Sequence, residues 1–414
     1  MPPRDPDHKP DLFNPSGVIH AARLPVTSLY IHVPFCGSKC SYCDFYSIPD
    51  PDEDLLVFWH DHLILELERL AGEADRQGVL LAPLRTVYFG GGTPSLLPVQ
   101  LLLSIVARIR ALFSFSSSCD ITLEANPESF SSREKARTLK LLVAAGVNRV
   151  SFGLQTSSDP LLASIGRRHT AKDLEFAISA AARAGVDHLA VDLMTGLPDQ
   201  RLQDLHETLN FIVKLPVDHV SAYALTLADQ TPMDLLYRKC PARFPDDELE
   251  RQMTHQVIVR LESAGFEHYE ISNFAKPAAR SRHNLVYWRA DPYLAAGPAA
   301  ASYLGGIRRV NPPSLKGWAD LVEDPGQGPY GAATVEELVD EKAARVETMV
   351  LGLRLIEGVT RQNFRLRHGI DYEEIFGKRL FSLEKRKLII QDQEGVRLSE
   401  RGLDFADLVA RELL

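Results

Sequence analysis

Apolar residues follow two different periods along the first half of the chain. Short apolar runs, rich in β-branched and aromatic residues, are each followed by a longer stretch in which apolar residues recur every three or four positions. The first pattern is typical of buried strands and the second of amphipathic helices. The predicted strands cover residues 29–33, 86–89, 121–124, 149–153, 188–193 and 219–224. The predicted helices cover residues 52–77, 99–112, 131–145, 171–184 and 202–214.

This alternation predicts an α/β fold with a parallel sheet, because strands that are separated by helices pair in the same direction. Gly146 and Gly185 directly follow two of the helices, where a left-handed residue is favoured. Six strand–helix repeats fall short of the eight that close a barrel, so we expect an open, partial (β/α)6 barrel at residues 25–265. The proline-rich residues 1–24 are predicted to be a flexible leader.

The remaining residues have a different pattern. A connecting segment at residues 266–331 ends in a Pro- and Gly-rich linker, and residues 332–414 are predicted to form a second domain. Helical patterns there cover residues 335–356, 362–366, 372–376 and 379–387, and a last helix starts at Glu400. Residues 388–391 and 396–398 flank a turn, as in the hairpin of a wing. We therefore expect a C-terminal α-rich, winged-helix-like domain.

Composition excludes several classes of protein. The net charge of −9 argues against a protein that binds nucleic acid electrostatically, and the last 81 residues, from Thr334, hold 16 acidic and 14 basic side chains. A regulator that binds nucleic acid through its winged domain is therefore disfavoured. No apolar run approaches the roughly 20 residues of a membrane span. The first twenty residues lack the apolar core of a secretory signal, so we expect a cytoplasmic protein.

Three cysteines gather directly after the first predicted strand. Cys36, Cys40 and Cys43 have the spacing C-x3-C-x2-C, and Pro34 and Gly37 place them on a loop. Thiolates select zinc or iron–sulfur clusters. A structural zinc site takes four ligands, whereas three thiolates on a four-iron cube leave one iron open to another molecule. A zinc site that borrows a distant histidine, or a disulfide with a spare thiol, is the alternative interpretation.

Polar or glycine-rich groups follow every predicted strand. Three glycines end the second strand, and such a run lets backbone approach a ligand and offer N–H and C=O groups to a carboxylate and an ammonium. Glu124, Gln155 and Asp192 end later strands and suit hydroxyl or amino groups, while Arg167 suits a carboxylate. Taken alone, each of these features can be explained as part of a turn or as an exposed surface charge. Because the strands are parallel, all of them are expected at one edge of the sheet.

Together these features resemble the radical SAM superfamily, in the branch that holds the oxygen-independent coproporphyrinogen III oxidases and the heme chaperone HemW. The matching segments run in order through residues 30–43, 89–95, 124–128, 151–155, 166–169, 192–200 and 283–288. The resemblance implies that Cys36, Cys40 and Cys43 bind a [4Fe-4S] cluster whose open iron is chelated by S-adenosylmethionine. It also implies a cofactor site lined by Tyr30, Gly91, Gly92, Thr93, Glu124, Gln155, Arg167 and Asp192.

Two details place the chain within this branch. The oxidases carry a further cysteine two positions after the third, where this chain has Phe45. His283 opens a segment, His-Asn-x-x-Tyr-Trp, that resembles a heme-chaperone signature, and an imidazole beside aromatic rings can ligate heme iron. A hydrogen-bonded structural role for His283 is the alternative. Where the family usually carries a histidine, this chain has Ala301, which puts any role of that histidine in doubt here.

The resemblance therefore implies a heme chaperone that binds heme and passes it to acceptor proteins, membrane-associated ones among them. It further implies an electron donor such as flavodoxin or ferredoxin, and no nucleic-acid partner. The alternative is an oxygen-independent coproporphyrinogen III oxidase (dehydrogenase), which removes propionate carboxyls by radical chemistry. No catalytic residue is assigned, so enzymatic activity stays open.

Overall fold

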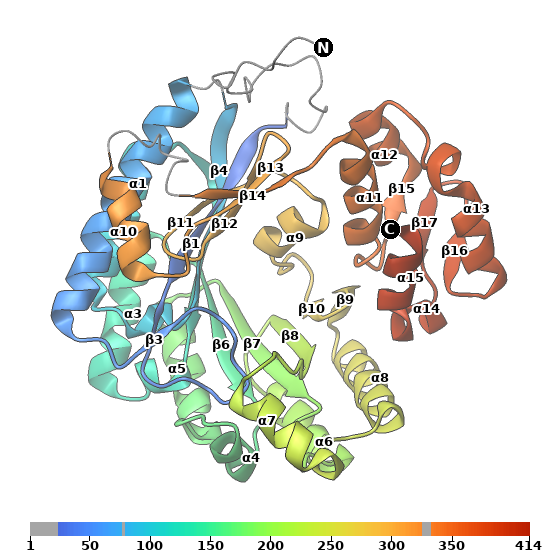
Figure 1. The fold of residues 1–414 in the computed structure, drawn as a ribbon. Helices are drawn as coiled ribbons and strands as arrows, with labels where there is room; N and C mark the ends of the chain where they lie inside the picture. Colours follow the sequence, from blue (N-terminus) through green and yellow to red (C-terminus); the bar gives the residue numbers. More distant parts are fainter. Residues whose placement is uncertain (1–23, 77–78, 325–332) are drawn as a thin grey trace.

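A computed structural model describes residues 24–76, 79–324 and 333–414 of the chain (Figure 1). The predicted leader, except Leu24, and the predicted linker, except Asp324, lie outside the described residues. The core of the structure is one open sheet of nine strands in the order β11-β1-β4-β5-β6-β7-β8-β10-β9. Helices cover the outer face of this sheet, and a second group of helices lies beside it (Figure 1).

The six predicted strands are confirmed as the parallel centre of the sheet. They are β1 (Val26–Val33), β4 (Leu81–Gly91), β5 (Phe115–Ala125), β6 (Arg149–Gln155), β7 (His188–Thr195) and β8 (His219–Ala224). Three shorter strands extend the sheet beyond the prediction: β11 (Leu294–Ala296) is parallel to β1, while β10 (Asn273–Ala275) and β9 (Glu267–Glu270) are antiparallel beyond β8. The sheet therefore continues past residue 265, the predicted end of the barrel. The domain boundaries themselves stay a prediction.

The predicted helices are also present. They are α1 (Glu53–Arg76), α2 (Val99–Leu112), α3 (Arg133–Ala145), α5 (Ala171–Ala184) and α6 (Leu202–Ile212). Further helices are α4 (Asp159–Ser164), α7 (Pro232–Lys239), α8 (Asp247–Ser263), α9 (Arg282–Trp288) and α10 (Leu315–Glu323). Gly146 (φ 108°) and Gly185 (φ 90°) end α3 and α5 in the left-handed conformation that their positions predicted. Leu29, Ile31, Phe89 and Phe152 lie in the core between the sheet and these helices, fully buried.

A buried carboxylate joins α1 to the segment that follows β11. Glu66 accepts hydrogen bonds from the backbone N–H of Gly297 (2.7 Å), from Asn311 Nδ2 (2.7 Å) and from Trp318 Nε1 (3.0 Å). Burial raises the pKa of Glu66 to about 7, although the three donors oppose this shift. One side chain thus fixes the loop at Gly297 and the helix α10.

The C-terminal domain differs from the prediction at two places. Residues 335–356 were expected to be one helix, but β14 (Thr334–Leu338) pairs with β13 (Ile307–Val310), and α11 (Glu341–Gly352) begins only where Asp340 caps it. The helices expected at 372–376 and 379–387 form one helix, α13 (Tyr372–Lys385), because Gly377 does not interrupt it. The other elements are β12 (Ala301–Leu304), β15 (Val359–Thr360), α12 (Arg361–His368), β16 (Ile389–Gln391), β17 (Gly395–Leu398), α14 (Glu400–Asp404) and α15 (Ala406–Leu413).

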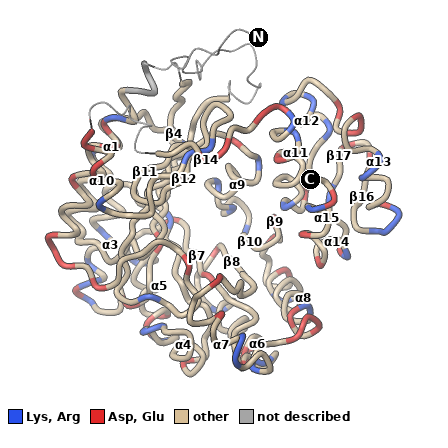
Figure 2. Tube along the Cα trace, in the orientation of Figure 1, with Lys and Arg blue, Asp and Glu red and all other residues tan. Residues whose placement is uncertain are grey.

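The expected wing is confirmed, since β16 and β17 pair as an antiparallel hairpin and β15 adds a third strand. Phe364, Tyr372 and Phe376 form the centre of a separate apolar core beneath it. Acidic and basic residues are interspersed over α11–α15 rather than separated onto different helices (Figure 2).

Helix α9 lies between the sheet and the C-terminal domain (Figure 1). The guanidinium of Arg354 lies over the ring of Trp288, 4.4 Å from its centroid, and the Arg354 carbonyl accepts a hydrogen bond from Ile271 N at 3.0 Å. Arg367 forms an ion pair with Asp291 at 3.2 Å. The segment that carries the predicted heme residue is therefore also the segment on which the second domain docks.

Candidate functional site

The cysteine loop is held at both its base and its tip. At the base, β2 (Phe35–Cys36) pairs with β3 (Ile48–Pro49), so the chain leaves and returns at one point. At the tip, Ser41 N donates to the carbonyl of Ile165 at 3.2 Å, and the Ser41 carbonyl accepts from Met233 N at 2.9 Å. The loop is thus positioned by the sheet below and by the helices α4 and α7 beside it.

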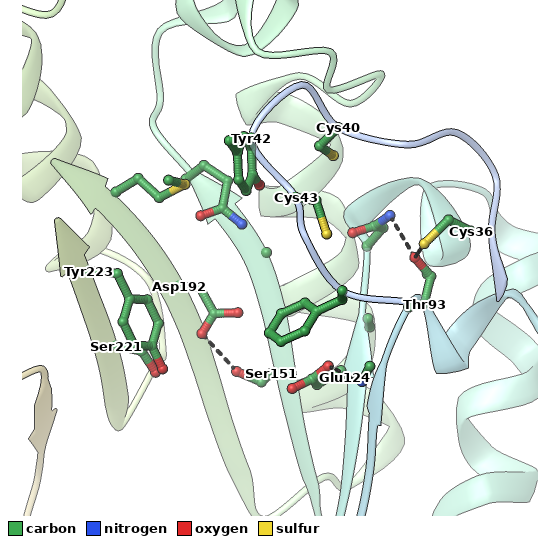
Figure 3. Close-up of a pocket in the computed structure, with 18 of the residues that line it drawn as sticks. Cys36, Cys40, Tyr42, Cys43, Thr93, Glu124, Ser151, Asp192, Ser221 and Tyr223 are labelled. Atoms are coloured by element: carbon green, nitrogen blue, oxygen red, sulfur yellow. Dashed lines mark hydrogen bonds between the residues drawn. The ribbon is translucent and has the colours of Figure 1, made fainter. Parts of the chain in front are cut away.

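All three cysteines line one cavity of about 480 Å³ at the carboxyl ends of the parallel strands. They lie opposite Glu124, Ser151 and Asp192 (Figure 3). The cavity is also lined by most of the residues expected from sequence: Gly91, Gly92, Thr93, Glu124, Gln155, Arg167 and Asp192. Tyr30 is the exception, since it lines a neighbouring cavity instead. Tyr30 lies on β1 in register with Tyr88 of the adjacent β4, and Tyr88 does line the first cavity; the assignment of Tyr30 to the cofactor site stays a prediction.

The glycine run is built for close backbone packing. Gly92 N donates to the carbonyl of Val33 at 2.8 Å, and Thr93 N donates to that of Phe35 at 2.6 Å. A Cβ on Gly92 would lie 2.5 Å from the Phe35 carbonyl oxygen, and Gly91 has a φ of 104°. These amides are therefore committed to the start of the cysteine loop, which differs from the expectation that they are free for a ligand.

Two carboxyl groups lie below the cysteines with raised pKa values. Glu124 accepts a hydrogen bond from the Tyr88 hydroxyl at 2.6 Å and a longer one from Gly91 N at 3.3 Å; burial raises its pKa to about 7. Asp192 accepts from the Ser151 hydroxyl at 3.2 Å, and burial raises its pKa to about 6. Near neutral pH both groups can be present protonated or ionised, so each can donate to or accept from a polar ligand.

Arg167 supplies a buried cation to the same cavity. Its Nη1 donates to Asn126 Oδ1 at 2.8 Å, Asn126 Nδ2 donates to Thr93 Oγ1 at 3.3 Å, and the Thr93 hydroxyl donates to Cys36 Sγ at 3.6 Å. Burial alone would lower the pKa of Arg167, but the neighbouring Tyr42 and other acidic groups outweigh burial and raise it. Its buried Nε has no hydrogen-bond partner among the described residues, which leaves a donor for a carboxylate.

These residues fit a cluster and an amino-acid-bearing cofactor. Within the described chain, no three His, Cys, Asp or Glu side chains lie close enough together to hold a single metal ion. A cubane instead takes each thiolate at a different iron. The thiols of Cys36, Cys40 and Cys43 would hold such a cluster, and the unpaired Nε–H of Arg167 would meet a cofactor carboxylate.

Sequence reasoning missed several residues of the cavity, among them Tyr88, Ser151 and Ser221, and it placed Tyr223 at the end of the sixth strand without giving it a role. Alternate residues of a strand face the same side of a sheet. Tyr223 is the last residue but one of β8 (His219–Ala224), so Ser221, two positions earlier, lies on the same face of the strand. The same rule would have found more of the polar lining than the strand ends alone did.

His283 is buried beside the cavity, with 2% of its surface exposed. Its Nδ1 is hydrogen-bonded to Thr86 Oγ1 at 2.8 Å and its Nε2 to Tyr287 Oη at 2.9 Å. Burial lowers its pKa to about 3, so the ring is neutral. Heme ligation by His283 is untested, and in this conformation it would require one of the two hydrogen bonds to break. The other residues of the segment divide their roles: Asn284 lines the first cavity, and Tyr287 lines its neighbour.

Comparisons with known proteins agree with this geometry. The family model described as "Radical SAM superfamily" matches residues 30–212, and the "HemN C-terminal domain" model matches residues 339–405. The first match begins within β1 and ends with α6, so it contains the second half of β1 and all of β4, β5, β6 and β7, but not β8. The second match covers α11–α14.

Three proteins illustrate how far the similarity extends. The chain is 36% identical over 382 residues to "Heme chaperone HemW" of Bacillus subtilis, covering 91% of this chain and 96% of that protein. It is 32% identical to the mitochondrial "Radical S-adenosyl methionine domain-containing protein 1" of Bos taurus, over 94% of this chain and 87% of that protein. Its fold matches that of the Escherichia coli coproporphyrinogen III oxidase HemN with a TM-score of 0.79 and 20% identity, over 95% of this chain and 92% of that chain.

Proposed function

This chain belongs to the heme chaperone HemW family of the radical SAM superfamily, and on that premise we propose that it binds heme beside a [4Fe-4S] cluster and S-adenosylmethionine and passes the heme to acceptor proteins. The superfamily implies the cluster and S-adenosylmethionine. The observation that carries the proposal is the single cavity in which three thiols, two carboxyl groups and Arg167 meet.

The chain's own residues have separate tasks at this site. Cys36, Cys40 and Cys43 hold the cluster, and Arg167 orients the cofactor carboxylate through its unpaired Nε–H. Glu124 and Asp192 hydrogen-bond to polar groups of the cofactor, and their raised pKa values let each act as donor or acceptor near pH 7. A reduced cluster with bound S-adenosylmethionine supplies one-electron chemistry.

Phe45 favours a chaperone over an oxidase. Its ring is 60% exposed and lines the cluster cavity at the position where the resembling oxidases carry a further cysteine. A chaperone has only to bind and release heme, whereas an oxidase must direct radicals to two propionate groups in turn. The likeness of this chain to the oxidase HemN lies at 20% identity and concerns the fold.

The proposed partners follow from the same function. They are heme, an electron donor such as flavodoxin or ferredoxin, and heme-accepting proteins, membrane-associated ones among them. The C-terminal domain, with its mixed charge, is proposed to dock a protein rather than nucleic acid. Within the described residues, none of the helices has both the length and the apolarity that a membrane crossing demands. We propose that the chain works in the cytoplasm.

The test uses one anaerobic preparation of the full chain, reconstituted with iron and sulfide. Heme binding is followed by difference absorption against the heme-free protein, and conversion of coproporphyrinogen III is assayed with S-adenosylmethionine and a reductant present. We expect heme binding and little or no turnover. Sustained formation of protoporphyrinogen IX would overturn the chaperone proposal and promote the oxidase, whereas the absence of heme binding would contradict both the function and its partners.

A further inference from the structure

The backbone at the end of β6 has an unusual conformation at Gln155. This residue has a φ of 68°, in the left-handed region that residues other than glycine rarely adopt. The Leu154 carbonyl accepts a hydrogen bond from Thr156 N at 2.9 Å, so residues 154–156 form a γ-turn. A γ-turn with a positive φ at its centre is the rare, strained form. Such strain persists only where the surrounding structure holds it.

The turn sets the direction of the Gln155 side chain. The pairing of β6 with β7 changes register here, because Gly153 lies opposite Asp192 whereas Gln155 lies opposite Leu193. An irregularity of this kind re-aims a side chain at the end of a strand. Gln155 is buried and lines the cluster cavity, and a Cβ on Gly153 would lie 3.0 Å from Gln155 Nε2. The amide of Gln155 is thus folded back over Gly153, and its place depends on the turn.

The imidazole of His169 contacts this turn from outside the cavity. Its side chain is fully buried, and Thr170, the next residue, fixes its position by capping α5. His169 Nε2 lies 3.2 Å from the carbonyl oxygen of Leu154, which can only accept, so Nε2 donates. Glu128 Oε2 lies 3.6 Å from Nδ1 on the other side of the ring. His169 is not part of the cavity lining.

We infer that His169 is a positioning residue of the cofactor site. It stabilises the strained turn at Gln155 and thereby holds the Gln155 amide in the cavity, although it does not touch the cofactor. The inference rests on the proposed function, in which this cavity takes S-adenosylmethionine.

The hydrogen bond from His169 decides which conformation the turn takes. A carbonyl oxygen has two lone pairs, and the γ-turn itself supplies a donor for one of them. His169 supplies the second donor to this buried oxygen, and that bond is lost if the Leu154 carbonyl rotates away from the imidazole. Without it, the strained residue is free to relax towards extended backbone. Relaxation changes φ at Gln155 and moves its amide out of its place in the cavity.

The chain after the turn is held by other contacts. Thr208, on α6, lies within hydrogen-bond distance of the Thr156 hydroxyl (3.2 Å) and accepts from Ser157 N at 3.1 Å. These contacts do not involve His169. Loss of its imidazole should therefore disturb the turn and leave the strand and the helix in place.

The experiment compares variants of the full chain, reconstituted anaerobically. His169→Leu removes the donor, so we expect about four irons as in the wild-type chain and an affinity for S-adenosylmethionine that is lower by about tenfold, the change for one lost hydrogen bond. The EPR spectrum of the reduced cluster measures this affinity. The matched control is His268→Leu, because His268 Nε2 also donates to a backbone carbonyl, that of Ile271, at 3.2 Å and lies outside the cavity. It should lower the free energy of unfolding without changing the cofactor affinity.

Two conservative variants separate positioning from packing. The side-chain amide of His169→Gln can donate from the place of Nε2, whereas that of His169→Asn is one bond too short. We expect the glutamine variant to recover most of the affinity and the asparagine variant to lose it. This comparison also decides the case if His169→Leu does not fold, since equal affinities in the two amide variants would overturn the inference.

A double-mutant cycle tests whether His169 acts through Gln155. Gln155→Ala removes the amide, so His169→Leu should cause no further loss of cofactor affinity in that background. Additive losses, or a His169→Leu variant that is destabilised with unchanged cofactor affinity, would overturn the inference and leave the proposed function standing. A wild-type cluster that does not respond to S-adenosylmethionine would overturn the proposed function, and this inference with it.

Discussion

The ring of His283 stacks on the ring of Tyr88, with centroids 4.9 Å apart and planes inclined by 21°. Tyr88 in turn donates its hydroxyl proton to Glu124, whose second oxygen accepts from Gly91 N. The signature segment on α9 is thereby connected to the glycine turn through two side chains. In this structure His283 packs against the cofactor site, and heme ligation by this residue stays a prediction.

Replacing His283 tests this connection. His283→Ala removes the stack and both hydrogen bonds in a buried place, so we expect a loss of about 2–4 kcal/mol in the free energy of unfolding. S-adenosylmethionine binding should weaken, because Tyr88, which donates to Glu124, loses the ring that packs on it. His283→Phe retains the ring stack and should recover part of the stability. Unchanged stability and unchanged cofactor affinity in His283→Ala would contradict the supporting role, whereas a changed Soret band of bound heme in both variants would support His283 as the heme ligand.

The three cysteines of the loop predict how much iron the reconstituted chain holds. The wild-type chain, reconstituted anaerobically, should hold about four irons, the content of one cubane cluster. Cys36→Ala, Cys40→Ala and Cys43→Ala should each abolish cluster formation, because each removes one of the thiols that line the cavity. Cys119→Ala is the control, since this cysteine is outside the cavity lining. Iron and sulfide analysis is the measurement, and full iron content in a triple cysteine variant would contradict the assignment.

S-adenosylmethionine should change the EPR spectrum of the reduced cluster if it binds the open iron. Gly92→Val should lose this response and part of the cluster, because its Cβ would collide with the carbonyl oxygens of Phe35 and Val33 at the start of the cysteine loop. Asp192→Asn keeps that backbone and should lower cofactor affinity with the cluster intact. A spectrum that saturating S-adenosylmethionine leaves unchanged in the wild-type chain would argue against an open iron.

Glu66 predicts a dependence of stability on pH. Its pKa is raised from 4.5 to about 7 in the folded chain, so between these values the folded state binds more protons than the unfolded state. The stabilising contribution is complete below pH 4.5 and is lost as the pH rises through about 7; it amounts to roughly 3 kcal/mol at about 1.4 kcal/mol per pKa unit.

Denaturant titrations of the wild-type chain and of Glu66→Gln between pH 5 and pH 8 measure this contribution. The free energy of unfolding should decline more steeply with pH in the wild-type chain, because the variant cannot titrate at this position. If the free energy of unfolding varies with pH in the same way in both proteins, then folding does not raise the pKa of Glu66.

The predictable part of the structure was the part with strong periodicity. The strands from β1 to β8 in the sheet centre are long enough to show an apolar pattern, whereas β9, β10 and β11 have three or four residues and acquire their conformation from pairing. Residues 335–338 have a helical composition, yet pairing with β13 makes them a strand. The local sequence alone does not determine whether these residues form a helix or a strand.

The candidate site was predictable to the same degree. Its residues end parallel strands, and parallel strands share one carboxyl edge, which brought Glu124, Gln155 and Asp192 into one cavity. Tyr30 lines the neighbouring cavity instead, because alternation reveals the face of a sheet but not the position across it, and its assignment to the cofactor site stays a prediction. The neighbouring cavity was not predictable, because Phe45 follows the cysteine loop whereas Tyr287 and Tyr293 lie in the distant segment around α9.

The pairing of β1 with β11 has a consequence for biosynthesis. Leu29 lies opposite Leu294, so the outer neighbour of the strand that leads into the cysteine loop is translated about 265 residues later. At ribosomal rates of about 5–20 residues per second, that interval lasts roughly 13–50 s. During that interval the nascent chain presents its three thiols beside a sheet edge that still lacks β11.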